Sequence, residues 1–280
     1  MTTTSPATAA PMAAPAALRQ ALWPPWQALT VHWFAQLPST NAWFQSHPIT
    51  LPTLVVAGEQ TAGQGQRGRA WHSPVGGLYW SVGYPVNQTP APILSLAIAA
   101  ALCSELRALG YGAVGVKWPN DLVANGAKLG GILVETLANG RNEWVVVVGV
   151  GINQSTPVAA EQPADRPMIG LTELPVAKPP PAAINHHALI GQLASAALET
   201  LAQPAAQLAD SLHARWPALD ALAGRAITLA QPSGGVVSGT AQGIAMDGGL
   251  QVITATGEQT FYSGESRVIS GWQASQRLLP

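Results

Sequence analysis

The chain has little charge, a single cysteine and no long apolar run. Of its 280 residues, 13 are Lys or Arg and 14 are Asp or Glu, which gives a formal net charge of -1. General binding to nucleic acid needs a strongly basic face, so this composition argues against it. The one cysteine, Cys103, excludes an internal disulfide, and its place in an apolar helical run predicts a buried thiol.

The longest apolar run, residues 93–103, is about half of the roughly 20 residues that a membrane-spanning helix needs. Residues 1–29 are rich in Ala, Pro and Thr and have no charged residue before Arg19. They lack the basic start of a secretory signal, so we predict a disordered tail. We therefore expect a cytoplasmic protein that does not associate with membranes.

Apolar residues make up 48% of the chain, which is ample for a sizeable core. The 143–150 segment is nearly all valine, so we expect it to be central in a sheet and buried on both faces. Strands and helices both occur, which indicates the α/β (α+β) class. The strands are predicted at 30–37, 53–57, 78–84, 114–118, 128–137 and 143–150, and the helices at 93–109, 183–201 and 205–216.

The pattern changes after Arg225 to short strands separated by glycine-containing turns. Several short strands in so short a span indicate a small β-barrel. We therefore divide the chain into a tail at 1–29, a larger domain at 30–221 and a small C-terminal barrel domain at 222–280. The short strands are predicted at 226–229, 236–245, 250–253 and 259–262.

The scarce basic residues gather in two short segments. Arg67 and Arg69 lie in the glycine-rich stretch 63–71, and Lys117 and Lys128 follow downstream. Rare cations beside glycines predict an anion site, with phosphate as the expected ligand. The glycine stretch is not a dinucleotide-binding fingerprint, because no helix follows it, and it lacks the Gly-Lys-Ser/Thr end of a phosphate loop. A flexible surface turn is the alternative interpretation.

Three further segments have patterns that suit ligand binding. In 116–122, Asn120 and Asp121 follow the end of a strand. In 128–135, a lysine opens an apolar strand with paired glycines, which suggest close approach of a ligand or another backbone. In 149–153, a buried strand ends in small residues and an amide. Taken singly, these features are also compatible with an ordinary turn or a solvated lysine at a strand end.

Taken together and in this order, the segments resemble the biotin–protein ligases. The resemblance covers residues 30–153 strongly and the C-terminal part weakly. It implies a mixed β-sheet flanked by helices, related to class II aminoacyl-tRNA synthetases, followed by a small Src-homology-3-like barrel. The matching pieces are Ser39-Thr40-Asn41, Gln60 to Trp71, Lys117 to Asp121, Lys128 to Glu135 and Gly149 to Asn153.

Some members of this family carry an N-terminal winged-helix DNA-binding domain and act as repressors. Residues 1–29 are too short and too apolar for such a domain. We therefore expect no binding to DNA. The sequence does not fix the oligomeric state, and we expect a monomer or a weak homodimer.

The resemblance implies a two-step reaction. The biotin carboxylate attacks the α-phosphate of ATP, with Mg²⁺, to give biotinyl-5′-adenylate. A lysine of the biotin carboxyl carrier protein of acetyl-CoA carboxylase then takes the biotinyl group. The implied catalytic residues are Lys128 and Arg67, with Asn120 as the contact on the Mg²⁺ side. The implied biotin contacts are Ser39, Thr40, Asn41, Gln60, Gly63, Gln64, Gly65, Gln66, Lys128, Gly130 and Gly131. The implied ATP contacts are Arg67, Gly68, Arg69, Trp71, Lys117, Asn120, Asp121 and Asn153.

The chain departs from the family pattern at Gln64 and Gln66, because the family usually has arginine in this loop. Glutamine donates hydrogen bonds without charge, and a charge-assisted bond is roughly twice as strong as a neutral one. We expect a looser hold on the adenylate unless Arg67 and Arg69 compensate. The alternative functions are a lipoate–protein ligase, a regulator that binds biotin or its adenylate without transferring it, and a nucleotide-binding module.

Overall fold

The computed structural model describes residues 11–87, 90–138, 144–157, 167–176, 185–232 and 234–269. The helices are α1 (Ala16–Ala21), α2 (Thr40–Trp43), α3 (Leu94–Ala108), α4 (His186–Leu201) and α5 (Ala205–Leu219), with 3-10 turns η1 (Pro24–Trp26), η2 (Gln66–Gly68) and η4 (Leu171–Glu173). The strands are β1 (Thr30–Phe34), β2 (Thr53–Ala57), β3 (Leu78–Val86), β4 (Val114–Lys117), β5 (Asp121–Ala124), β6 (Ala127–Ala138), β7 (Trp144–Ile152), β8 (Ala226–Ala230), β9 (Val236–Ile244), β10 (Leu250–Thr254), β11 (Gly257–Phe261) and β12 (Glu265–Val268).

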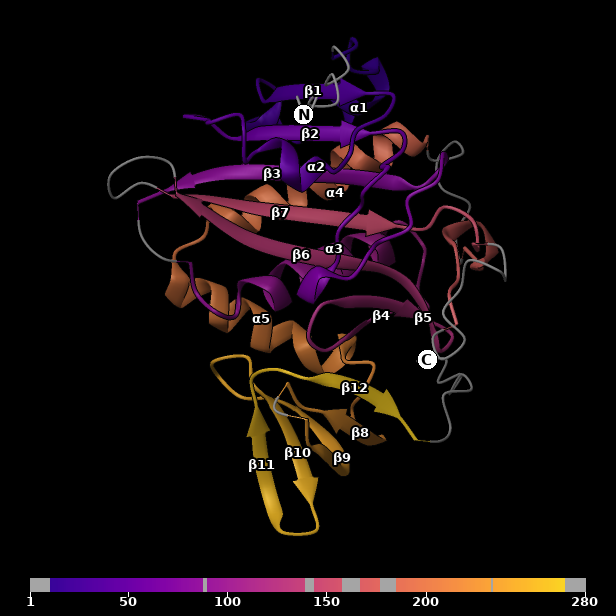
Figure 1. Ribbon diagram of the computed structural model, residues 1–280, viewed down its shortest axis with the longest axis vertical. Coiled ribbons are helices and arrows are strands. Elements are labelled where there is room, and N and C mark those ends of the chain that lie inside the picture. The colour runs from indigo at the N-terminus through magenta and orange to yellow at the C-terminus, as the bar shows by residue number, and fades with distance from the viewer. Residues whose placement is uncertain are drawn as a thin grey trace, which may run out of the picture.

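Seven strands form one large sheet in the order β1-β2-β3-β7-β6-β5-β4. The pair β1–β2 is parallel and the other pairs are antiparallel, so the predicted mixed sheet is confirmed. Helices α3 and α4 pack on one face of this sheet, and α5 lies against α3 (Figure 1). Strand β7 is fourth in the order and buried from Val145 to Ile152, which confirms the prediction of a central valine strand.

The two faces of the large sheet bury two separate apolar clusters, because successive side chains of a strand point to opposite sides. Trp80 and Val148 belong to the larger cluster, which includes α3 and α4. Val55 and Val147 belong to the smaller cluster, which includes Phe44 just after α2. The short helix α2 therefore lies on the face opposite to α3 and α4, and this face also carries the site described below.

Cys103 lies on α3 inside the larger cluster and is fully buried. Burial raises the pKa of its thiol to about 11, so the thiol stays protonated at neutral pH. The prediction of a buried, unreactive cysteine is confirmed. No helix within the described ranges is long and apolar enough to cross a membrane.

The C-terminal strands form a second, antiparallel sheet in the order β11-β10-β9-β8-β12. It lies below the large sheet in Figure 1, next to α5 and β4. The antiparallel strands were predicted, but the described part of this domain forms no closed barrel: β12 pairs with β8, while β11 pairs with β10. Two hydrogen bonds join this sheet to the turn after β4, from the Trp118 indole to Gly248 O at 3.0 Å and from the Ser266 hydroxyl to Trp118 O at 3.1 Å.

The N-terminal segment corrects the prediction of a disordered tail at 1–29, because residues 11–29 pack on the larger domain. Helix α1 contacts α4, where Leu18 is fully buried. Gly191 on α4 permits this approach, since a Cβ there would meet Leu18 O at 2.5 Å. The Trp26 indole also donates to Glu199 at 2.9 Å. A few apolar anchors thus order a segment whose overall composition suggested disorder.

The predicted hairpin loop at 138–142 and most of the predicted loop at 157–181 lie outside the described residues. The two strands on either side of that hairpin, β6 and β7, do pair in an antiparallel manner from Gly130–Ile152 to Ala138–Trp144.

Candidate active site

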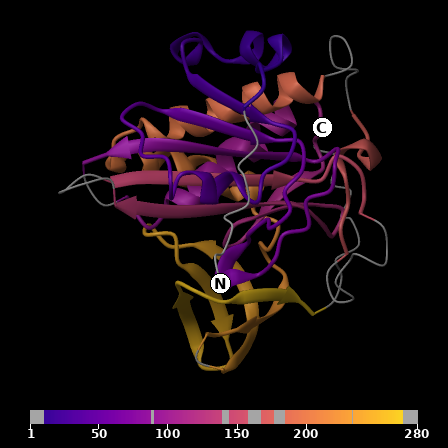
Figure 2. The same cartoon turned by 45° about the horizontal axis from the view of Figure 1, so that its top comes forward.

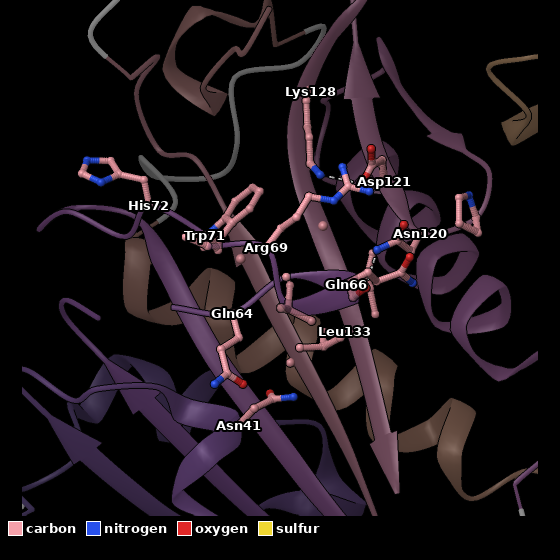
Figure 3. A pocket seen from close by; sticks show the side chains of 18 of the residues that line it. Asn41, Gln64, Gln66, Arg69, Trp71, His72, Asn120, Asp121, Lys128 and Leu133 are labelled. Atoms are coloured by element: carbon pink, nitrogen blue, oxygen red, sulfur yellow. Dashed lines mark hydrogen bonds and ion pairs between the residues drawn. The ribbon is translucent and has the colours of Figure 1, made fainter. Parts of the chain in front are cut away.

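A cavity of about 200 Å³ opens on the α2 face of the large sheet. Its walls come from α2, the glycine-rich loop 63–71, the turn between β4 and β5, the first half of β6, the end of β7 and the start of β12. Figure 3 shows side chains from these segments around a common space. The predicted site residues that line it are Ser39, Thr40, Asn41, Gln60, Gln64, Gly65, Gln66, Arg69, Trp71, Lys117, Asn120, Asp121, Lys128 and Gly131.

One end of the cavity is lined by α2 and the start of the glycine loop, and neither segment places a charged side chain there. We call this the uncharged end and define it by Thr40, Asn41 and Gln64. In Figure 3, Asn41 and Gln64 lie together, away from the charged side chains. Helix α2 presents these residues because Ser39 caps it, with its hydroxyl accepting from Ala42 N at 3.4 Å. Thr40 and Asn41 are both nearly fully buried.

Asn41 lies against β7 at a position where only glycine fits. A Cβ at Gly149 would overlap the Asn41 amide oxygen. A side chain also packs closely against Gly151 of the same strand, where a Cβ would meet the Trp71 indole nitrogen at 2.5 Å. The small residues at the end of β7 therefore make room for two side chains of the cavity, as the sequence pattern of 149–153 suggested.

Gln60 connects the uncharged end to the glycine loop. Its Oε1 accepts from Thr40 N at 2.8 Å, and its Nε2 donates to Ser73 Oγ at 2.9 Å. Ser73 in turn donates to the carbonyl oxygen of Trp71 at 3.2 Å. The amide of Gln60 thus fixes α2 relative to the loop that covers the cavity.

The opposite end is lined by Arg69, Asp121, Lys128 and Glu265, and we call it the charged end. Lys128 Nζ lies 2.7 Å from Asp121 Oδ1, and it also stands 5.1 Å from the centre of the Trp71 ring. Arg69 pairs with Glu265 at 3.3 Å, which links the glycine loop to the second sheet. Two of the four cations expected near a phosphate, Arg69 and Lys128, are therefore paired with carboxylates within the chain.

Tight turns place the charged end. Strands β4 and β5 form a hairpin around residues 118–120, with Lys117 opposite Asp121. Strands β5 and β6 form a second hairpin around Asn125-Gly126, whose positive φ angles of 50° and 83° suit this pair of residues. Asn120 donates through Nδ2 to Ile132 O at 2.8 Å, which leaves its Oδ1 as an acceptor.

The glycine loop folds back on itself. Gly65 N donates to Arg69 O at 2.7 Å, and Trp71 N donates to Gly63 O at 2.9 Å. Gly63 has no room for a side chain, since a Cβ there would overlap Trp71 O. Between these bonds Arg67 has a φ of 60° and an exposed side chain.

Five of the predicted site residues do not line the cavity: Gly63, Arg67, Gly68, Gly130 and Asn153. Gly130 packs against Gly151 O, where a Cβ would come within 2.6 Å, and Asn153 donates to the backbone oxygen of Ile169 at 3.2 Å. These two residues support the strands behind the cavity. The Arg67 side chain is exposed and does not line the cavity, so a catalytic role for Arg67 stays a prediction.

Sequence reasoning missed several residues of the cavity. His72, Leu133 and Met168 line it, as do Glu265 and Ser266 from β12. The local sequence does not predict that Glu265 and Ser266 belong to the site, because their contact with it depends on how the second sheet packs. Ser81 on β3 lies just behind the wall, and a serine among apolar strand residues was a usable signal.

The described residues contain no cluster of three or more His, Cys, Asp or Glu side chains that could hold a metal ion. Any cation at this site would therefore take most of its ligands from a bound molecule or from water. The oxygens of Asp121 and Asn120 are of the type that Mg²⁺ prefers.

Comparison with protein families gives two matches along the chain. Residues 33–153 match the model described as "Biotin/lipoate A/B protein ligase family", and residues 223–265 match "Biotin protein ligase C terminal domain". The first match contains the cavity residues of the large sheet, and the second contains Glu265.

Two curated relatives illustrate the sequence similarity. The bifunctional ligase/repressor BirA of Escherichia coli is 41% identical over 121 residues, which are 42% of this chain and 38% of that protein. The biotin–[acetyl-CoA-carboxylase] ligase of Mycobacterium tuberculosis is 34% identical over 165 residues, which are 55% of this chain and 58% of that protein. The matched part thus spans less than two thirds of either relative.

The fold is also found among solved structures. A biotin protein ligase from Aquifex aeolicus in complex with biotin and ATP superposes with a TM-score of 0.67 at 21% identity, covering 86% of this chain and 99% of that one. At this identity the likeness establishes the fold alone.

Proposed function

Because this chain belongs to the biotin/lipoate A/B protein ligase family, we propose that it is an ATP-dependent biotin–protein ligase. It activates biotin as biotinyl-5′-adenylate and transfers the biotinyl group to a lysine of the biotin carboxyl carrier protein of acetyl-CoA carboxylase. The observation that best supports this proposal is one cavity with two unlike ends. A neutral end suits the ureido ring of biotin, and the Lys128 and Arg69 cations of the charged end suit its carboxylate beside a phosphate.

In the first step, a carboxylate oxygen of biotin bonds to the α-phosphorus of ATP, the bond to the bridging oxygen breaks, and pyrophosphate leaves. Two anions must be brought together, so cations at the charged end reduce their repulsion. Lys128 exchanges its partner Asp121 for the reacting groups. The arrangement acts mainly by positioning, because the two reactants are held at fixed places in one cavity.

In the second step, the uncharged amine of the carrier lysine attacks the acyl carbon of the mixed anhydride, AMP leaves and the amine loses a proton. The anhydride must be protected from water until the carrier arrives. We assign that task to the glycine loop, including Arg67 and Gly68, which closes over the intermediate.

We also propose that Mg²⁺ accompanies ATP, with Asn120 and Asp121 contributing oxygen ligands beside the phosphates. An amide oxygen and a carboxylate match the oxygen preference of this ion, and phosphate oxygens and water complete its coordination. The ion would neutralise charge on the phosphates. We place the protein in the cytoplasm, as a monomer or a weak homodimer.

The proposal is tested by incubating the purified chain with ATP, Mg²⁺, labelled biotin and a biotin carboxyl carrier domain. We expect label on the carrier, and no label when the target lysine of the carrier is replaced by arginine. Labelled lipoate in place of biotin should give none. Transfer of lipoate alone would contradict the proposal in favour of a lipoate ligase, and binding of biotin without transfer would indicate a regulator.

A further inference from the structure

We propose that Asn153, which does not line the cavity, is a positioning residue that holds the backbone of Lys128 in a β-bulge and so directs the lysine side chain to the cavity. This inference rests on the proposed function, because it concerns the lysine assigned to adenylate formation. It gives Asn153 a task different from the ATP contact that the family resemblance implied.

Lys128 lies next to an irregularity in strand β6. Leu122 of β5 pairs with Gly130 of β6. The next residue of β5, Val123, pairs with Lys128, so Leu129 has no partner on β5. One extra residue on one strand of an antiparallel pair is a β-bulge, which bends the strand and redirects its side chains.

The bulge decides which side chain of β6 faces the cavity. Gly131 lines the cavity, and a Cβ on it would lie 3.5 Å from Lys128 Nζ. Strict alternation, counted back from Gly131, would place Leu129 on the cavity face and Lys128 in the core. Instead, Leu129 is fully buried in the larger apolar cluster, and Lys128 faces Asp121 at 2.7 Å in the cavity (Figure 3). The position of the lysine therefore depends on the bulge.

Strand β7 ends before it can hold the bulge, because its pairing with β6 begins at the pair Gly130–Ile152. Asn153, the residue after the end of β7, takes over with its backbone. Its N–H donates to Leu129 O at 2.9 Å. The residue that is unpaired on the β5 side is thus bonded on the β7 side.

A separate segment, residues 167–169, runs parallel to Lys128 on the same side. Lys128 N donates to Pro167 O at 2.8 Å, and Ile169 N donates to Lys128 O at 3.0 Å. The lysine is therefore bonded through both its N–H and its carbonyl oxygen to a segment that lies about 40 residues away in the sequence.

The Asn153 side chain joins this segment to the bulge. It is nearly fully buried, and its Nδ2 donates to Ile169 O at 3.2 Å and, at a longer distance of 3.5 Å, to Lys128 O. One amide NH₂ thus lies between two carbonyl oxygens that repel each other, one on each side of the junction. Without this donor, both the segment and the bulged peptide lose a shared partner, and the lysine can shift.

The test measures biotin-dependent exchange between ATP and labelled pyrophosphate in the full chain. In Asn153→Ala, we expect kcat to fall about 10–100-fold, because a displacement of about 1 Å at a reacting site costs on the order of a hundredfold. The KM values for biotin and ATP should change by less than about threefold, since the lost contacts lie within the protein. Gln27→Ala, which removes an exposed amide of the N-terminal segment, is the control and should be normal.

A second variant keeps the shape of the side chain and removes only its donor. Asn153→Asp directs an oxygen at two carbonyl oxygens, so we expect a larger loss of kcat at alkaline pH than in Asn153→Ala. Burial raises the pKa of the introduced carboxyl, and a protonated carboxyl can donate again. The activity of this variant relative to the wild-type chain should therefore recover in part as the pH is lowered.

Coupling to Lys128 separates positioning from other roles. In the Lys128→Ala background, Asn153→Ala should lower the residual exchange by less than about twofold, because no ammonium group is left to misplace. An equal loss in both backgrounds would overturn the inference. A raised KM for ATP would then indicate direct nucleotide contact, and a lowered thermal stability alone would indicate a structural role.

Normal kcat in both Asn153 variants would also overturn this inference, and it would leave the proposed function intact because the wild-type chain would still show exchange. Absence of biotin-dependent exchange in the wild-type chain would contradict the proposed function, and this inference with it.

Discussion

The two ends of the cavity hold their polar groups in different ways. At the charged end, two cations lie close to carboxylates, Lys128 to Asp121 and Arg69 to Glu265. At the uncharged end, neutral groups are linked in a continuous network through Gln60 and Ser81. A charge pair can be exchanged for a phosphate, whereas a network fixes the direction of each bond. The charged end is thus suited to chemistry and the uncharged end to recognition.

The two ends also differ in how far apart their residues lie in the sequence. Two residues of the charged end, Asp121 and Lys128, come from consecutive hairpins and are close along the chain. The uncharged end combines α2, β3, β6 and β7, which span residues 40–152. Local turns therefore bring Asp121 and Lys128 together, whereas the uncharged end needs formation of the whole sheet.

The largest expected effect is at the charged end. Lys128→Ala should lower the rate of adenylate formation by several orders of magnitude, because it removes the ammonium group beside Asp121 and the Trp71 ring that would stabilise the developing charge. Pyrophosphate release measures this rate. Circular dichroism should show an intact fold, and Arg19→Ala, at an exposed site on α1, should be normal. Near-normal pyrophosphate release from Lys128→Ala would remove Lys128 from the catalytic residues.

The next largest effect is expected on the affinity for biotin alone. Gly149→Ala places a methyl group against the Asn41 amide oxygen and should displace it. We expect biotin to bind on the order of 10–100 times more weakly, as loss of one or two hydrogen bonds implies, while affinity for ATP is unchanged. Gly112→Ala is the control, since nothing lies within 4 Å of a Cβ there. Equal loss of biotin and ATP binding would contradict the separation of the two ends.

A positive charge introduced at the uncharged end should slow the release of the intermediate. Gln64→Arg restores the residue type that the family usually has in this loop and can form a charge-assisted bond to the intermediate. We expect biotinyl-5′-adenylate to escape about tenfold more slowly, because such a bond is roughly twice as strong as a neutral one. A quench assay of released adenylate measures the rate. An unchanged rate would show that the glutamine does not limit retention.

The smallest effect is expected where the second sheet meets the charged end. Glu265→Gln removes the ion pair with Arg69, whose side chain is 43% exposed. Pairs this exposed contribute about 0–1 kcal/mol, so the KM for ATP should change by less than about fivefold. Glu258→Gln in the same sheet is the control. A change of several hundredfold would mean that Glu265 acts directly on the nucleotide.

The sequence allowed prediction of much of the large sheet and of the charged end. Rare cations beside glycines marked Arg69 and Lys128, and the valine strand marked the centre of the sheet. Strand β5 is not among the predicted strands, although Asn125-Gly126 is a strong hairpin signal. That error concerned a local pattern and was avoidable.

The remaining errors come from long-range packing. The N-terminal segment is ordered by contacts with α4, more than 160 residues away, such as Trp26 with Glu199 at a separation of 173 residues. Glu265 reaches the cavity because Trp118 bonds to the second sheet. None of these contacts has a periodicity or spacing that a single sequence displays.

The most direct test of the whole account is biotin-dependent exchange between ATP and labelled pyrophosphate, measured on the purified chain with Mg²⁺ and with lipoate as the control. The account predicts exchange with biotin and none with lipoate, because activation needs both the ureido-binding end and the charged end of one cavity. No exchange, in a folded protein that still binds biotin, would contradict the assignment of the charged end as a catalytic centre.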